Sequence, residues 1–401
     1  MPEPSEDRIL SAAGSSVPPG TAAERIELWL RDTAFPFWAA AGVDTAGPGF
    51  VEHLTLDGRP ADVPYKRVRV QARQIYCFCQ AADSGWHPDG VAIAQRGIDL
   101  LLKSAWQGRE RGWVSTLTRD GAPLQRIPDL YDIAFVLFAL AWWHRVTGDP
   151  RVTTLGCETL DFLTAHMRHP SGRGYLHRLH GEAPHLQNPH MHLTEAMIAL
   201  RDTTGHARFA EEADTLVKLC LDHFLDGATL AEEFNADWGR DPHPRAAEIE
   251  PGHHYEWVWL LHGYLGPGRQ RSDIEAAMGC LFDFATRFGQ SSKTGLVLDA
   301  VYADGSPAKQ DHRLWPQAER LKGWLAMAER HGVPAKQTIE TGTADIFRFY
   351  LDTQPPGTWV EHRTPELTAC ADKIPTSSFY HVVLAFAEVL RLRHLVEGSA
   401  P

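Results

Sequence analysis

Three histidines stand at comparable positions in separate apolar segments of this 401-residue chain. His192 lies in QNPHMHLTEA, His253 in PGHHYEWVWLL and His381 in SSFYHVVLAF. Imidazole titrates near neutral pH and can therefore both take up and return a proton. In a helix Glu256 would share a face with His253, where a carboxylate fixes the ring's tautomer and raises its pKa. The pattern predicts acid/base chemistry, although each histidine taken alone could equally be a packed or capped residue.

A second group of side chains suits a ligand rich in hydroxyl groups. Trp315 and Glu319 are four residues apart in RLWPQAERL, so they share a helix face that offers an aromatic ring and a hydroxyl acceptor. A packed indole beside a solvated carboxylate is the alternative. Arg73 in the apolar segment QARQIY needs a partner, while Tyr131 adds a hydroxyl and Asn188 an amide. These five residues are candidates for substrate binding.

Asp132, next to Tyr131, adds a carboxylate to this group. Weaker candidates on a connector are Glu232, Phe234 and Trp238. His190 and His192 are two residues apart and point about 200° away from each other on a helix, so the HMH string does not suit joint metal ligation. We expect His190 to be structural.

Several familiar site motifs are missing from the sequence. It has no GxGxxG after a strand, no GxxxxGK[ST], no GxSxG, no HExxH and no zinc-finger spacing. Nucleotide, serine-hydrolase and zinc-protease functions therefore lack motif support. We expect no cofactor and no metal, and an uncharged sugar as the ligand.

Composition narrows the partners and the compartment. The net charge is −12, which disfavours nucleic acid and anionic membranes as partners. The N-terminal 20 residues lack the basic and apolar regions of a signal peptide, and the six cysteines are scattered without a CxxC pair. We expect a cytoplasmic protein with reduced thiols, as a monomer or homodimer.

The candidate residues recur at a nearly constant step along the chain. The steps are 58, 61, 61, 62 and 66 residues, between Arg73, Tyr131, His192, His253, Trp315 and His381. Each landmark opens an apolar helical segment, over 67–82, 129–148, 188–205, 253–265, 314–332 and 377–395. Amphipathic segments alternate with these, over 24–42, 91–106, 151–169, 208–225, 272–289 and 336–352.

Six helical hairpins of this kind predict an all-α fold, a closed (α/α)6 barrel with the apolar helices inside. An open solenoid is the alternative, but it would not need polar groups at the same depth in every inner helix. Length alone suggests about two or three domains. The repeat favours one barrel over residues 21–398, preceded by a polar tail over 1–20.

The connectors that lead into the inner helices resemble one another. Each contains a short run of β-prone residues, in most cases next to a glycine turn. The five segments are RGWVSTLTRDGAP, GRGYLHRLHGEAP, LAEEFNADW, TGLVLDAVYADGSP and GTWVEHRTP. They predict short β-hairpins at one end of the barrel. The N-termini of the inner helices open at this end, where their N–H groups favour a developing negative charge. We therefore place the active site at the hairpin end.

The sequence resembles the N-acylglucosamine 2-epimerase superfamily, particularly its mannose isomerase branch. Five blocks, in this order, carry the resemblance: QARQIY, QNPHMHL, PGHHYEWVWLL, RLWPQAE and SSFYH. The resemblance covers the chain from about Lys66 to Leu395. It implies an (α/α)6 barrel and conversion of aldoses to ketoses or C2 epimers without metal or nicotinamide. By this resemblance His253 and His381 would be the acid/base pair, with His192 assisting in ring opening or hydroxyl binding. Sugar-binding residues would be Arg73, Asn188, Glu256 and Trp315.

Together these observations predict a cofactor-independent isomerase that converts D-mannose to D-fructose through a cis-enediol. A 2-epimerase acting on mannose, a disaccharide or an N-acylhexosamine remains the nearest alternative, because the two reactions differ only in where the proton returns. A glycoside hydrolase on the same barrel would need two carboxylates about 5 to 10 Å apart. That function would leave the histidines unexplained.

Overall fold

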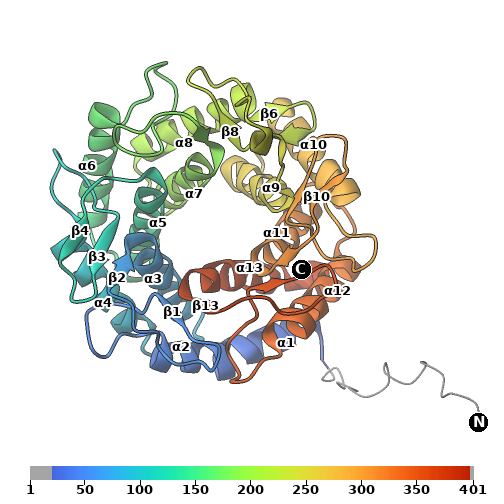
Figure 1. The fold of residues 1–401 in the computed structure, drawn as a ribbon, viewed down its shortest axis with the longest axis horizontal. Coiled ribbons are helices and arrows are strands. Elements are labelled where there is room, and N and C mark those ends of the chain that lie inside the picture. Colours follow the sequence, from blue (N-terminus) through green and yellow to red (C-terminus); the bar gives the residue numbers. More distant parts are fainter. Residues whose placement is uncertain (1–19, 398–401) are drawn as a thin grey trace, which may run out of the picture.

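The computed structural model describes residues 20–397. The tail expected over residues 1–20 lies outside this range apart from Gly20. Six inner helices surround a central axis, and each packs against the next until α13 returns to α3 (Figure 1). They are α3 (Val68–Asp83), α5 (Leu130–Thr147), α7 (Gln187–Thr204), α9 (Pro251–Leu265), α11 (Leu314–His331) and α13 (Phe379–Arg391). The contact between α13 and α3 closes the ring, which confirms the predicted barrel and excludes the open solenoid.

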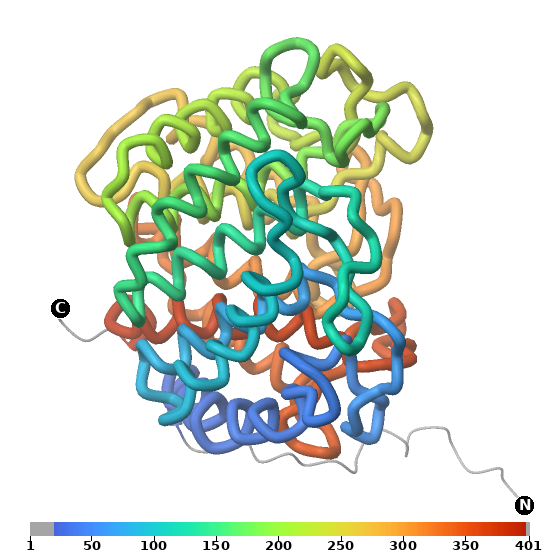
Figure 2. The backbone as a smooth tube through the Cα atoms, turned by 90° about the vertical axis from the view of Figure 1, so that its left-hand side faces the viewer, coloured from blue at the N-terminus to red at the C-terminus, as the bar shows by residue number. Residues whose placement is uncertain are grey.

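A second ring of helices surrounds the first. Its members are α1 (Ala22–Trp29) with α2 (Phe35–Ala41), α4 (Gly90–Leu100), α6 (Arg151–His166), α8 (Ala207–Leu219), α10 (Ser272–Phe288) and α12 (Lys336–Ile346). A short helix, α14 (Arg393–Glu397), follows the last inner helix. Figure 2 shows from the side how the helices of both rings run between the two ends of the barrel.

Local sequence explains where the inner helices begin and end. Asp129 caps α5, because its carboxylate accepts hydrogen bonds from the backbone N–H groups of Tyr131 and Asp132. Gly148 ends the same helix in the left-handed conformation (φ 69°), which glycine adopts without steric cost. From Leu130 to Ala141 every residue of α5 except Tyr131 is buried, because this part of the helix contacts neighbours on all sides.

Short strands join the connectors at the end where the inner helices begin. The pairs are β1 (His53–Leu54) with β13 (Ile374–Pro375), β2 (Tyr65–Arg67) with β3 (Thr116–Thr118) and β4 (Pro123–Gln125), β5 (His185–Leu186) with β8 (Glu233–Phe234), β6 (Leu225–Asp226) with β7 (Thr229–Leu230), β9 (Ala300–Val301) with β10 (Pro307–Lys309), and β11 (His312–Arg313) with β12 (His362–Arg363).

The predicted hairpins are confirmed in two connectors, where β3 pairs with β4 and β9 with β10. Elsewhere β5–β8 and β11–β12 join successive connectors instead, because neighbouring inner helices bring these segments side by side. All six cysteines are unpaired. Within residues 20–397 no helix has the length and apolar character needed to cross a bilayer.

Candidate active site

The barrel brings the six landmark residues together around its axis. Tyr131 contacts the ring of His192 at 5.1 Å between centroids, on one side of the cavity. On the other side the indole of Trp315 lies 5.0 Å from the ring of His253 and 5.7 Å from that of His381. These residues lie in the first two turns of their helices, at the hairpin end where the sequence places the site.

His253 is held by a carboxylate from a connector. Its Nδ1 lies 3.0 Å from both carboxylate oxygens of Glu232, and its Nε2 lies 3.2 Å from Nδ2 of Asn188. Burial disfavours the charged ring, but the carboxylates of Glu232 and Glu250 outweigh burial and raise the pKa of His253 to about 9. His253 is therefore protonated at neutral pH.

The partner of His253 differs from the one expected from the helix spacing. Glu256 accepts no hydrogen bond from the described residues and lies nearest to Nδ1 of His192, at 3.8 Å. Its side chain is directed toward α7, where it affects His253 only through its charge. The prediction that Glu256 fixes the tautomer of His253 is wrong, and Glu232, one of the weaker candidates, does so.

His381 is bonded to Glu319 and differs from His253 in its protonation state. Its Nδ1 donates to Oε1 of Glu319 at 2.8 Å, while Oε2 of the same carboxylate lies 2.6 Å from Nζ of Lys322. Burial, together with the positive charges of Arg73 and Lys322, holds the pKa of His381 well below its usual range. His381 is therefore neutral. Both oxygens of Glu319 face protein groups, so this residue orients His381 instead of accepting from a sugar hydroxyl.

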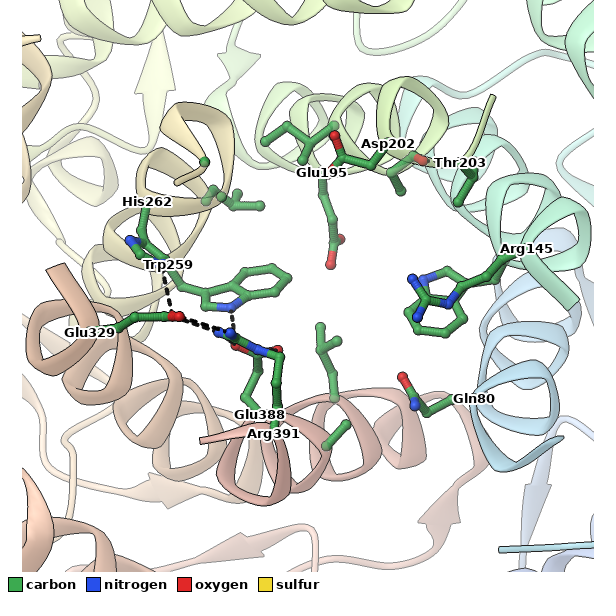
Figure 3. Close-up of a pocket in the computed structure, with 18 of the residues that line it drawn as sticks. Gln80, Arg145, Glu195, Asp202, Thr203, Trp259, His262, Glu329, Glu388 and Arg391 are labelled. Carbon is green, nitrogen blue, oxygen red and sulfur yellow. Dashed lines mark hydrogen bonds and ion pairs between the residues drawn. The ribbon is translucent and has the colours of Figure 1, made fainter. Parts of the chain in front are cut away.

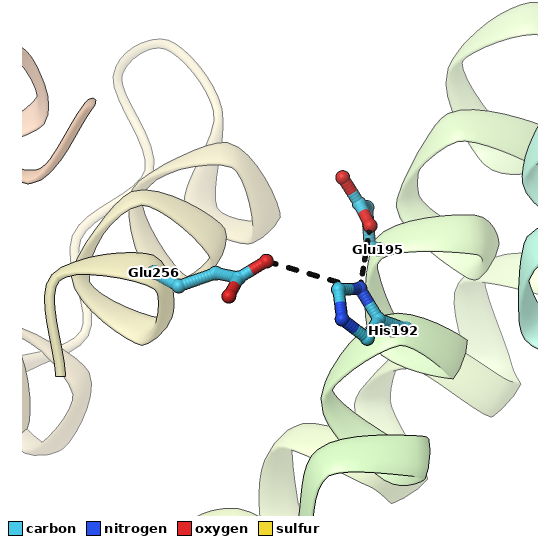
Figure 4. A group of neighbouring side chains, drawn as sticks. All are labelled: His192, Glu195 and Glu256. Carbon is cyan, nitrogen blue, oxygen red and sulfur yellow. Dashed lines mark hydrogen bonds and ion pairs between the residues drawn. The ribbon is translucent and has the colours of Figure 1, made fainter. Parts of the chain in front are cut away.

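His192 sits deeper, between two acids. Its Nδ1 lies 3.0 Å from Oε2 of Glu195 and 3.8 Å from Oε1 of Glu256 (Figure 4). Burial outweighs the attraction of Glu195 and lowers the pKa of His192 to about 4. Burial and the charge of Glu319 hold the pKa of Glu256 well above its usual range.

Arg73 brings an unneutralised positive charge to the cavity. Its Nη2 donates to the hydroxyl of Tyr131 at 2.6 Å, and its guanidinium lies 4.1 Å from the ring centre of Phe135. Arg73 is 6% exposed and forms no ion pair with a carboxylate in the described part of the chain. Such a group stabilises negative charge that develops on a bound substrate.

The remaining binding candidates contact the same histidines. Asn188 is half-buried, and its side-chain amide lies against Nε2 of His253. The half-buried indole of Trp315 packs closely on Gly252, where a Cβ atom would come within 2.5 Å of the ring. A glycine next to His253 thus lets the indole lie against the histidine.

Three other polar residues point elsewhere. Asp132 pairs with Arg69 (Oδ1 to Nε, 3.0 Å), so its carboxylate does not serve the cavity. Trp238 packs against the ring of His169 at 4.8 Å. His190 uses both ring nitrogens on backbone groups, of Leu186 and Tyr175, which confirms its structural role.

Two sets of side chains here have the spacing of metal ligands. They are His192, Glu195 and Glu256, and Glu256, Glu319 and His381; within each set the ligand atoms lie within 4.8 Å of one another. The ammonium of Lys322 already supplies a positive charge to the second set, which works against a divalent ion there. The expectation of a metal-free site stays a prediction.

A funnel of about 1300 Å³ opens at the opposite end of the barrel, where the inner helices end (Figure 3). Trp259 lines it and donates from Nε1 to Oε2 of Glu388 at 3.1 Å, and Arg391 pairs there with Glu329. Glu195 also lines this funnel. Glu195, which is hydrogen-bonded to His192, therefore lies between the funnel and that histidine.

The sequence pattern of the N-acylglucosamine 2-epimerase (GlcNAc 2-epimerase) family matches residues 49–385. The chain belongs to this family. It is 31% identical over 373 residues to a mannose-6-phosphate isomerase of Rhizobium meliloti (strain 1021), which covers 90% of this chain and 95% of that protein. The resemblance inferred from the five sequence blocks is confirmed.

Solved structures agree in fold. A cellobiose 2-epimerase from Spirochaeta thermophila DSM 6192 superposes with a TM-score of 0.80 at 25% identity, over 94% of this chain and 96% of that one. A crystal structure of D-mannose isomerase gives a TM-score of 0.82 at 22% identity, over 92% and 98%. The protein is thus an enzyme of a sugar epimerase and isomerase family with the (α/α)6 barrel fold.

The pairing of His253 with Glu232 predicts a pH-dependent stability. Because the pKa of His253 is raised to about 9, the pair stabilises the folded state fully below about pH 6.5 and less as the pH rises through 9. Glu232→Gln should lower the free energy of unfolding by on the order of 2 kcal/mol near neutral pH. Urea unfolding from about pH 6 to pH 10 measures this difference, which should shrink toward zero at the alkaline end.

Glu233→Gln is the matched control, because Glu233 pairs with the exposed Arg245 and should show a small, pH-independent effect. A difference between wild type and Glu232→Gln that stays constant over the whole pH range would contradict the charged state of His253.

Proposed function

We propose that the protein is a cofactor-independent isomerase that converts D-mannose to D-fructose through a cis-enediol. The observation that carries this proposal is the pair formed by His253 and His381, which flank the same indole and hold opposite protonation states. Groups whose surroundings push their pKa values apart are suited to act as acid and base in one reaction.

His381 is the base in this mechanism. Its Nδ1–H is bonded to Glu319, so Nε2 carries the free lone pair that takes the proton from C2 of the open-chain sugar. The C2–H bond breaks and the electron pair moves toward the carbonyl, which gives an enediolate. His381 then returns the proton to C1, and a proton shift between O2 and O1 completes the ketose.

The remaining polar groups handle ring opening and charge. His253 is protonated and donates to the ring oxygen as the sugar opens, and His192 assists by binding a hydroxyl. Arg73 stabilises the enediolate oxygen. A carbon acid of this kind is far weaker than imidazolium, so the electrostatic contribution must amount to several kcal/mol.

Charge around the cavity favours a sugar without a phosphate group. Arg69 and Arg313 lie over the rings of Tyr131 and Trp315, but each is paired with a carboxylate, of Asp132 and Glu250 respectively. Their charges are neutralised within the protein. Mannose 6-phosphate, named by one relative, is therefore the comparison substrate and not the proposed one.

Two other functions are weaker alternatives. A 2-epimerase would return the proton to C2 from the opposite face, and His253, the second acid, could supply it. A glycoside hydrolase would need free carboxylates, whereas Glu232 and Glu319 are each bonded to a histidine and Asp132 to an arginine.

Incubation of the protein with D-mannose in D₂O tests the reaction. We expect fructose with deuterium at C1, because the base exchanges its proton with solvent during the enediol's lifetime. Parallel incubations with mannose 6-phosphate and cellobiose define the substrate class. Glucose with deuterium at C2 would instead identify a mannose 2-epimerase, and no turnover of mannose would reject the proposal.

His253→Ala and His381→Ala should each abolish turnover of mannose and leave the fold intact. General acid/base groups contribute about 10²- to 10⁴-fold, and here each group serves an essential proton transfer. Initial rates, with circular dichroism as the check on folding, measure the effect. His331→Ala, at the exposed end of α11, is the control and should keep full activity. Full activity in either active-site variant would remove that residue from the mechanism.

Dialysis against EDTA should leave the rate of mannose turnover unchanged. The proposed base and acid are both imidazoles, and the positive charges near the oxyanion come from Arg73 and the helix N-termini. The measurement is turnover before and after dialysis, with readdition of Mg²⁺, Mn²⁺ or Zn²⁺ as the check. Loss of activity that only a divalent ion restores would assign a metal to one of the His/Glu sets.

A further inference from the structure

Lys322 is a buried ammonium behind the active site. It lies on α11, one turn after Glu319, and is 0% exposed. Its Nζ is 2.6 Å from Oε2 of Glu319 and 4.0 Å from the ring centre of Trp259. A lysine is almost never fully buried unless its charge is compensated, so this position must be electrostatically favourable.

Three buried carboxyl groups provide that compensation. Glu195, Glu256 and Glu319 are 2%, 1% and 0% exposed, and their negative charges hold the pKa of Lys322 above its usual range despite burial. His192 and His381, the rings bonded to two of these acids, are neutral. The ammonium of Lys322 thus balances negative charge on these three buried acids.

The contacts form a chain from the ammonium to the proposed base. Lys322 binds one oxygen of Glu319, and the other oxygen accepts the Nδ1–H of His381. A carboxylate in this position orients the imidazole and stabilises the imidazolium that forms when the ring takes a proton, but only while the carboxylate is ionised. Burial alone would favour its neutral form.

We propose that Lys322 is a positioning residue that keeps Glu319 ionised and directed at His381, as a built-in cation behind the catalytic base. The inference rests on the proposed function for its kinetic consequence, but the charge state of Glu319 can be measured without any substrate. Glu256, Glu319 and His381 have the spacing of metal ligands, and Lys322 is paired with one of them, Glu319. Its ammonium therefore supplies a positive charge where a metal ion would otherwise bring one.

Titratable groups of five inner helices face Glu319 or Lys322. They are Tyr76 on α3, His192 and Glu195 on α7, His253 and Glu256 on α9, the Glu319–Lys322 pair itself on α11, and Tyr380 and His381 on α13. Burial raises the pKa of both Glu319 and Glu256, and the charge of Lys322 acts against this effect. Glu319, the direct partner, should respond most when this charge is removed.

Infrared difference spectroscopy of the substrate-free protein tests the charge state. In wild type at neutral pH, comparison with Glu319→Gln should show the loss of a carboxylate band and no loss of a protonated carboxyl band. This measurement does not depend on any lysine variant. A protonated Glu319 in wild type would overturn the proposal.

Lys322→Gln keeps a hydrogen-bond donor but removes the charge, whereas Lys322→Arg keeps the charge. Lys322→Gln should gain a protonated carboxyl band that disappears in the double variant with Glu319→Gln, and Lys322→Arg should not gain it. Lys218→Gln, which removes the lysine of an exposed pair with Asp222, is the matched control and should leave the spectrum unchanged. An unchanged carboxylate in folded Lys322→Gln would also overturn the proposal.

The kinetic test separates positioning from a merely structural role. Lys322→Gln should lower kcat about tenfold or more with little change in KM, and should move the acidic limb of the kcat/KM profile to higher pH. Lys322→Arg should restore the wild-type limb. If wild type fails to convert mannose, the proposed function fails while the infrared result still decides on Lys322. An unshifted profile in Lys322→Gln would remove Lys322 from the mechanism.

Discussion

The proposed chemistry depends on the carboxylate that pairs with each buried imidazole and on the charges around that pair, which set the pKa of the ring. His253 faces Glu232, with Glu250 nearby, and is held protonated. His381 faces Glu319, whose charge is balanced by Lys322, and is held neutral. Both rings contact one indole, yet they differ in charge because Glu232 and Glu250 raise the pKa of His253, whereas burial, Arg73 and Lys322 lower that of His381. Acid and base therefore come from identical side chains.

Closure of the barrel is what makes these pairings possible. Partners such as Tyr380 and Glu195 are 185 residues apart in sequence and meet only because the inner helices of different repeats face one axis. The connectors contribute as well, since Glu232 directly precedes β8, which is held in place by its pairing with β5. A ring of six helices can thus present acids and histidines from different repeats around one axis.

The repeat made the barrel and the position of its site predictable from sequence. A period near 60 residues fixes which face of each inner helix points inward, so the histidines could be placed at one level. The partner carboxylates were harder to assign. Helix spacing favoured Glu256 for His253, but the actual partner, Glu232, comes from a connector 21 residues upstream, where no periodicity applies. Lys322 is spaced like any exposed i, i+3 partner of Glu319, and its burial follows only from tertiary packing.

The arrangement also bears on why one site type can support either isomerisation or epimerisation. Both begin with removal of the C2 proton, for which a neutral His381 is suited. The outcome then depends on which acid reaches which carbon first. His381 can return its proton to C1 on the same face, while the protonated His253 stands beside Trp315 and could reach C2. Small shifts of the sugar against the indole would alter this competition, because proton transfer requires hydrogen-bond distance. The orientation set by Trp315, packed against Gly252, is therefore part of the specificity of the reaction.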